Sequence, residues 1–248
     1  MIIIKSPAEI EIMREAGRVV GRVLEAVSRA VKPGVSTASL DKQAEEMARQ
    51  LGAVPAFKGY RGYPYSLCCS VNEQVVHGFP GPAPLKEGDI LSMDFGVILD
   101  GFYGDAATTV AVGATSKEAQ ALLTATKTSL EAGIAKCRLG NHLGDVSSAV
   151  QKVVEGAGFS VVRQFVGHGI GRGLHEEPQV PNFGQPDRGV RLKAGMVLAI
   201  EPMVNAGGFE VRILEDGWTA VTVDGKLSAH FEHTVAVTAD GPRILSLP

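Results

Sequence analysis

The feature that most constrains this chain of 248 residues is a short pattern that occurs twice. Residues 85–94 and 192–201 each read Leu-Lys-x-Gly, then a mostly apolar run, then one carboxylate. The carboxylate is Asp94 in the first copy and Glu201 in the second. A polar turn followed by such a run is typical of a buried strand. The two copies indicate two similar halves, each of which brings one acid to a binding site at the seam between them.

The repeat extends beyond the two acidic strands. A helix-like stretch at 33–52 has a counterpart at 139–158, at nearly the same offset as the carboxylates. Two matched segments at nearly one offset favour a duplication over a chance match. We therefore expect a single catalytic domain over 1–248, built from pseudo-repeats at about 1–114 and 115–248.

Each half is expected to contain two helices followed by strands. Ser6-Pro7-Ala8-Glu9 is typical of a capped helix start, and Thr115 with Glu118 predicts another. Apolar residues at helical spacing predict helices at 7–31, 40–51 and 144–157, and a further helix after the Thr115 cap that carries Ala119 to Ile134. Strands are expected at 66–76, 90–98, 102–112, 160–166, 196–204, 209–214, 217–223 and 230–238. This order favours an α+β fold with antiparallel strands over a parallel βαβ winding.

Composition narrows the function classes. The net charge of −3 gives no reason to expect DNA or a membrane surface as a partner. The three cysteines, Cys68, Cys69 and Cys137, are too few for a disulfide framework or a zinc knuckle. The N-terminus is charged too early, at Lys5, for a signal peptide, and no apolar run approaches the length of a membrane span. We expect a cytoplasmic protein.

A predicted hairpin brings two aspartates together. Asp100-Gly101 is a strong two-residue turn signal, and it places Gly96 opposite Asp105. Asp94 and Asp105 then share one face as diagonal neighbours, with Cβ atoms about 6–8 Å apart. Two carboxylates about 6 Å apart repel by about 3 kcal/mol at a dielectric constant of 20. Strand interiors also disfavour Asp. A cation between the two is therefore favoured, and two solvated aspartates on an exposed face are the alternative.

Other candidate ligands follow later in the chain. The glycine-rich segment 167–178 is expected to be an extended loop that carries His168 and His175. Their spacing does not fit the helical zinc motif, and a dinucleotide loop would need a helix start that is absent. Glu232 lies inside a strand run, where it alone reads as a surface residue and beside the others as a bridging ligand. Four carboxylates and one imidazole are the ligands expected for two divalent ions that share a water, which suits amide hydrolysis.

Together these motifs resemble the type I methionine aminopeptidases, over essentially the whole chain. The resemblance rests on the segments 6–9, 60–64, 70–73, 77–78, 93–96, 104–105, 167–178, 200–202 and 230–234. It implies the pita-bread fold of that family, in which two pseudo-symmetric halves each pack two helices on antiparallel strands, with the metal site at the seam.

The resemblance also implies a metal ligand set. Asp94 would bind one ion, Asp105 and Glu232 would bridge, and His168 with Glu201 would complete the other site. The cofactors would be two divalent ions, with Co, Mn, Fe and Zn all left open. A bridging water or hydroxide would attack the scissile amide, with Glu201 as general base and then as proton donor to the leaving amine.

The implied substrate contacts come from six further residues. His77 would contact the scissile amide, although a turn residue is its alternative, and His175 would stabilise the oxyanion. The methionine pocket would be formed by Tyr60, Tyr63, Cys68 and Trp218. Cys68 has the alternative of a small buried apolar residue, and Trp218 that of a core aromatic. Because one methylene separates substrates only about 10–200-fold in an apolar pocket, the small second residue would be selected by steric exclusion.

Three positions depart from the family pattern. Leu174 stands where phenylalanine is usual, Phe57 where cysteine is common, and Arg61 where histidine is commoner. These departures bear on the shape and selectivity of the pocket and not on the metal chemistry.

The implied function is removal of the initiator methionine from nascent proteins and peptides when the second residue is small. We expect a cytoplasmic monomer that acts on nascent N-termini, and docking on the ribosome is left open. The chain shows no N-terminal extension and no long insertion between Pro178 and Gly195, as expected for a minimal, bacterial-style type I enzyme.

Three rival readings are weighed against it. A prolidase or aminopeptidase P would need an additional large N-terminal domain. A binding module without catalysis would have lost ligands, whereas all five positions are filled. A hydrolase of small, creatine-like molecules would not need the aromatic pocket.

Overall fold

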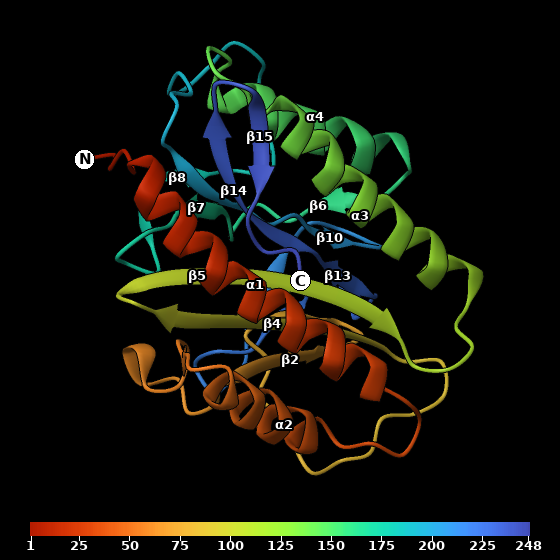
Figure 1. The fold of residues 1–248 in the computed structure, drawn as a ribbon. Coiled ribbons are helices and arrows are strands. Elements are labelled where there is room, and N and C mark those ends of the chain that lie inside the picture. The colour runs from red at the N-terminus through yellow and green to blue at the C-terminus, as the bar shows by residue number, and fades with distance from the viewer.

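Two pairs of helices flank one curled antiparallel sheet in the computed structural model, which describes residues 1–248 (Figure 1). The helices are α1 Pro7–Ala30, α2 Thr37–Gln50, α3 Lys117–Lys136 and α4 Leu143–Gly156. All four predicted helices are confirmed, with small shifts at their ends. No helix combines the length and the hydrophobicity that a membrane span requires.

The large sheet has nine strands, all paired antiparallel, so the predicted α+β arrangement is confirmed. Its order is β1-β4-β5-β14-β9-β7-β8, with β2 beside β4 and β15 beside β14. The bounds are β1 Val54–Pro55, β2 Leu67–Val71, β4 Ile90–Leu99, β5 Phe102–Ala111, β7 Gly167–Gly169, β8 Glu176–Val180, β9 Val197–Ile200, β14 Glu232–Thr238 and β15 Gly241–Ile244.

Two small sheets and one 3₁₀ turn complete the fold. The first sheet pairs β13 Ser228–His230, β10 Met203–Asn205 and β6 Ser160–Val161. The second pairs β11 Val211–Ile213, β12 Ala220–Thr222 and β3 Gln74–Val76. The 3₁₀ turn is η1 Tyr60–Gly62.

The helix starts follow the capping chemistry with one correction. Ser6 caps α1, because its hydroxyl accepts from the Glu9 N–H while the Glu9 carboxylate accepts from the Ser6 N–H. At α3 the cap is Ser116 and not the predicted Thr115. The Ser116 hydroxyl accepts from the Ala119 N–H, so the helix begins one residue later than the pattern indicated.

Several predicted strands are broken by turns. The run 66–76 divides into β2 and β3 because Asn72 has a φ of 55° and turns the chain. The run 196–204 divides after β9 at Pro202, which has no N–H to donate to a strand neighbour. The run 230–238 divides at Phe231 into β13 and β14, and the run 160–166 is a strand only as β6.

The predicted loop at 167–178 is wrong in part. Residues 167–169 form β7, and β8 begins at Glu176, with Gly167 opposite Val180 and His168 opposite Gln179. Glycine repeats weaken the local strand signal, but β7 is enclosed by β9 and β8, which supply its backbone partners. His168 therefore sits on a strand and not on a loop.

The predicted hairpin is confirmed in its full register. Gly96 faces Asp105 and Asp94 faces Ala107, and the turn residues Asp100 and Gly101 both have positive φ. Helix α1 packs across one face of this hairpin (Figure 1). A Cβ on Gly104 would lie only 2.8 Å from the Ala16 carbonyl carbon. This glycine therefore lets α1 pack against β5 right beside Asp105.

Candidate metal centre and adjoining pocket

One cavity of about 190 Å³ gathers every residue that the sequence predicts for the site. The predicted residues that line it are Asp94, Asp105, His168, Glu201, Glu232, His77, His175, Tyr60, Tyr63, Cys68 and Trp218. The remaining three lining residues are Phe57, Arg61 and Leu174, which are the three departures from the family pattern. The cavity thus joins an acidic end to an aromatic end.

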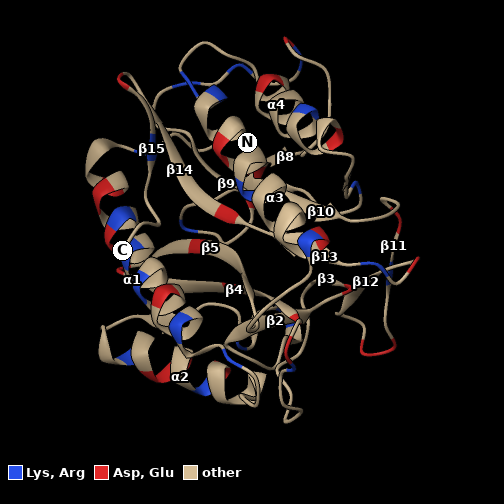
Figure 2. Ribbon diagram, turned by 90° about the vertical axis from the view of Figure 1, so that its right-hand side faces the viewer, with Lys and Arg blue, Asp and Glu red and all other residues tan.

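The five candidate ligands come from five consecutive strands of the large sheet, β4, β5, β14, β9 and β7. Asp94 is on β4, Asp105 on β5 and His168 at the centre of β7. Glu232 opens β14, and Glu201 directly follows β9. Figure 2 shows acidic positions on β4, β5 and β14, strands that are otherwise almost free of charged residues. The sheet itself therefore brings together residues that are far apart in the sequence.

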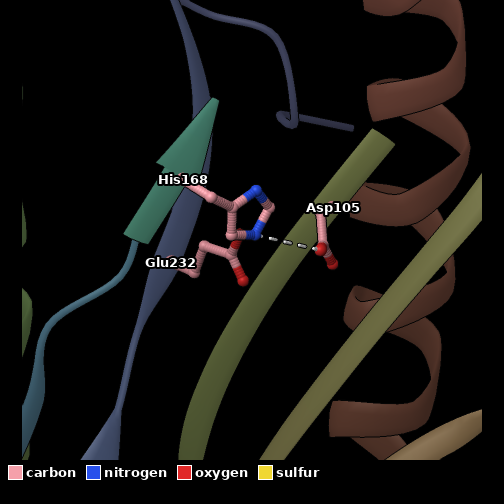
Figure 3. A group of neighbouring side chains, drawn as sticks. All are labelled: Asp105, His168 and Glu232. Carbon is pink, nitrogen blue, oxygen red and sulfur yellow. Dashed lines mark ion pairs between the residues drawn. The ribbon is translucent and has the colours of Figure 1, made fainter. Parts of the chain in front are cut away.

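Their side chains converge from different strands. Figure 3 shows Asp105, His168 and Glu232 turned toward one another, and one ligand atom of each lies within 4.8 Å of the others. His168 Nε2 lies 4.0 Å from Asp105 Oδ2 and 3.4 Å from Glu201 Oε1. His168 Nδ1 lies 2.9 Å from the carbonyl oxygen of Gly169. A hydrogen on Nδ1 donates to that carbonyl, which leaves the Nε2 lone pair facing the carboxylates.

The four carboxylates have few ion-pair or hydrogen-bond partners. Asp105 and Glu232 are 4% and 2% exposed, and Asp94 and Glu201 are partly buried at the cavity wall. No Lys or Arg pairs with any of them, since their only ion-pair neighbours are histidines. Asp94 Oδ1, Asp105 Oδ1 and Glu232 Oε1 are buried without a hydrogen-bond partner. Unpaired buried carboxylates are costly unless a cation neutralises them, so these residues fit a divalent metal ion.

Burial shifts the protonation of the whole cluster. It raises the pKa of Asp94 to about 7. Burial also raises the pKa of Asp105 and of Glu232 well above the usual range, and the neighbouring acids add to both shifts. For Glu201 burial alone raises the pKa well above its usual range. Burial lowers the pKa of His168 to about 3, which keeps the imidazole neutral and able to bind a metal.

The two other predicted histidines also line the cavity. His175 stands beside His168, with ring centroids 4.4 Å apart, and its Nδ1 is 2.8 Å from the Tyr60 hydroxyl. His77 has a φ of 59° and its ring is edge-on to Trp218. Burial lowers the pKa of His77 to about 4, so this side chain is neutral at pH 7.

The aromatic end is rigidly packed. Tyr63 and Trp218 meet edge to face at 5.1 Å, and the Tyr63 hydroxyl donates to the Gly78 carbonyl at 3.0 Å. Cys68 pairs with Asp94 across β2 and β4. Burial raises the pKa of the Cys68 thiol well above its usual range, so it packs as a small apolar group and not as a nucleophile. Phe57 closes the wall beside Gly96, where a Cβ would lie 2.7 Å from its ring.

One residue at the site was missed from the sequence. His230 is 1% exposed, and its Nε2 lies 3.7 Å from Glu201 Oε2. Ligand atoms of Glu201, His230 and Glu232 all lie within 4.8 Å of one another. The available signal was spacing, because residues two apart on an extended chain share a face, and Glu232 was already a candidate.

Comparison with known proteins finds metallopeptidases that are similar over nearly the whole chain. The profile of "Metallopeptidase family M24" matches residues 11–239. The methionine aminopeptidase of Clostridium perfringens is 56% identical and covers 100% of this chain and 99% of its own length. Methionine aminopeptidase 1 of Bacillus subtilis is 53% identical, with 99% of both chains covered.

Solved structures agree with the sequence relatives. The crystal structure of methionine aminopeptidase from Thermotoga maritima superposes with a TM-score of 0.98 at 49% identity, with 100% of both chains covered. Prolidase from Pyrococcus furiosus superposes with a TM-score of 0.81 at 20% identity, over 99% of this chain and 66% of its own, which shows a shared fold alone. The expected pita-bread fold is confirmed.

Proposed function

The chain belongs to metallopeptidase family M24, and from that premise we propose that it removes the N-terminal methionine from polypeptides whose second residue is small. Its full-length relatives named methionine aminopeptidase support the reading of a metallo-hydrolase of this kind. The observation that supports it most is the single cavity in which unpaired carboxylates adjoin a pocket of aromatic and sulfur-containing side chains. In this proposal the protein works as a cytoplasmic monomer on nascent chains.

Two divalent ions would be held by the acidic end of the cavity. Asp94 would bind one ion, His168 and Glu201 the other, and Asp105 with Glu232 would be shared by both. The unpartnered oxygens of Asp94, Asp105 and Glu232 support this assignment. When bound, such ions supply an activated water and stabilise developing negative charge on an amide. A carboxylate-rich set with one imidazole accepts Mn, Fe, Co or Zn.

Glu201 would move the proton that amide hydrolysis requires. Its carboxylate faces the cavity, and burial raises its pKa well above the usual range. A carboxylate that faces the attacking water can take its proton and return it to the leaving amine. The proximity of His168 Nε2 at 3.4 Å fixes which face of the carboxylate lies toward the other ligands.

His175 and His77 would hold the scissile amide. If the Tyr60 hydroxyl donates to His175 Nδ1, the ring hydrogen stands on Nε2, which is free to donate to the substrate carbonyl oxygen. A donor placed at the developing oxyanion is worth more in the transition state than in the bound substrate. His77, which lines the cavity beside Trp218, would contact the amide and the methionine backbone.

The methionine side chain would fill the aromatic end. Tyr63, Trp218, Cys68, Phe57 and Leu174 offer ring edges and apolar surface, against which a thioether gains about 0.3–1.5 kcal/mol per aromatic contact. The cavity of about 190 Å³ is below the size of about 300–1,000 Å³ typical of drug-sized ligand sites. It therefore suits one side chain and a small neighbour, which fits selection of the second residue by steric exclusion.

Release of free methionine from Met-Ala-Ser and Met-Leu-Ser tests the proposal. The protein is first stripped of metal with a chelator and then supplied with Mn(II) or Co(II). Release from Met-Ala-Ser alone supports both the reaction and the steric rule. No release with any metal, despite measured metal binding, would overturn the aminopeptidase reading, and cleavage of Ala-Pro in its place would indicate a proline-directed peptidase.

A further inference from the structure

We propose that His230 is a positioning residue for Glu201, which it holds at the carboxylate oxygen that His168 does not approach; this rests on the role of Glu201 in the proposed function. Glu201 lies between two imidazoles, one at each carboxylate oxygen. His168 Nε2 is 3.4 Å from Oε1, and His230 Nε2 is 3.7 Å from Oε2. The two histidines thus divide the two oxygens of one carboxylate between them.

The two imidazoles differ in their access to the cavity. His168 is one of the lining residues, whereas His230 is not and is only 1% exposed. His230 therefore lies beneath the cavity lining, where a ligand atom of Glu232 is also within 4.8 Å of its own. Its Nε2 is buried with no hydrogen-bond partner. A side-chain shift of less than 1 Å would bring Nε2 and Oε2 to the usual N–H···O separation of about 2.9 Å.

The backbone of His230 is fixed by the other half of the molecule. Thr109 on β5 accepts from the His230 N–H at 2.9 Å and donates to the His230 carbonyl at 2.7 Å. Asp105 has the same relation to Thr234 on β14, whose hydroxyl donates to the Asp105 carbonyl at 2.7 Å. His230 thus occupies the place in the second half that Asp105 occupies in the first. The fold presents both side chains toward one centre.

A purely structural role explains His230 less well. A buried nitrogen without a partner lowers stability, so a core position with no function would favour an apolar side chain. When the His230 Nε2–H donates to Glu201, the nitrogen gains a hydrogen-bond partner and Oε2 of the carboxylate is held in place. The other oxygen is then held on the His168 side, where a metal ion would bind. Groups that orient a metal ligand in this way are worth about 10–100-fold in metal affinity or activity.

Calorimetric titration of the metal-free protein with Co(II), without peptide, tests this role. His230→Leu removes the donor, and we expect it to weaken the tightest ion by about 10–100-fold. His230→Gln keeps an N–H donor and should recover most of that loss. His233→Leu is the matched control, because His233 Nδ1 contacts Ser246 Oγ at 2.8 Å and the ring faces away from the carboxylates. Its Co(II) affinity should stay at the wild-type value.

Two results would overturn the proposal. The first is a folded His230→Leu protein that binds Co(II) as tightly as the wild type, with the same visible absorption spectrum. The second is a proton NMR spectrum of the Co(II)-loaded wild type with two shifted, exchangeable imidazole N–H signals, one of which His230→Gln removes. That result would make His230 a direct ligand. These experiments contain no peptide, so their results test the role of His230 even if the protein proves not to be an aminopeptidase.

Discussion

Thr109 and Thr234 make the same pair of hydrogen bonds across the seam between the two halves. The Thr109 hydroxyl bridges the N–H and carbonyl of His230, and the Thr234 hydroxyl bridges those of Asp105. The backbone of Thr234 is engaged elsewhere, since its N–H donates to Ser246 Oγ and its carbonyl accepts from the Leu245 N–H. The β5–β14 ladder therefore ends before Thr234, where its hydroxyl replaces the backbone bonds, and the Thr109 hydroxyl likewise joins β5 to β13.

Loss of one such hydroxyl should destabilise the seam. In Thr234→Val, the N–H and carbonyl of Asp105 lose this partner inside the protein. Each buried group left unsatisfied costs about 1–3 kcal/mol. Thr238→Val is the control, because its hydroxyl bonds Gly241 at a partly exposed position. Urea unfolding should show a clearly larger loss for Thr234→Val. Equal stability of the two variants would contradict this reading of the seam.

His175, which stands beside His168 in the cavity, should contribute more to catalysis than to substrate binding. Removing one donor to a developing oxyanion costs about 10²–10³ in kcat, so His175→Ala should lower kcat by that factor with a smaller change in KM. Tyr60→Phe removes only the hydroxyl that contacts His175 Nδ1 and should have a milder effect. Steady-state kinetics on Met-Ala-Ser separate the two parameters. An unchanged kcat in His175→Ala would refute the assigned role.

The folding stability of the metal-free protein should depend on pH, because its buried carboxylates lie close together. Burial raises the pKa of Asp94 to about 7, so the folded state holds a proton that the unfolded state releases near pH 4. This contribution is fully present below about pH 4 and is lost as the pH rises toward about 7. Metal-free Asp94→Asn should therefore gain stability relative to the wild type between pH 5 and pH 7. A difference independent of pH would show that Asp94 is ionised throughout.

Local signals predicted the parts of the fold that are fixed by near neighbours. The Asp100-Gly101 turn set the β4–β5 register, and Ser6 with Glu9 set the start of α1, because two to four residues decide each geometry. The carboxylates on those strands could then be placed by counting along the chain.

The rest of the site depends on contacts between distant segments. The pairing of β7 with β9 and β8 is supplied by strands outside the glycine-rich run, so His168 was misplaced on a loop. His230 escaped notice because its approach to Glu201 depends on the break between β13 and β14 and on Thr109. Neither relation has a local sequence pattern.

Titration of the metal-free protein with Co(II), with methionine release from Met-Ala-Ser followed at each addition, tests the central claim most directly. The account predicts no release before metal is added, a rise that follows occupancy of the acidic end, and no release from Leu-Leu-Ser. It also predicts that Glu201→Gln, measured fully loaded with metal, releases little or no methionine. Undiminished release in excess chelator, or full activity of the loaded Glu201→Gln protein, would contradict it.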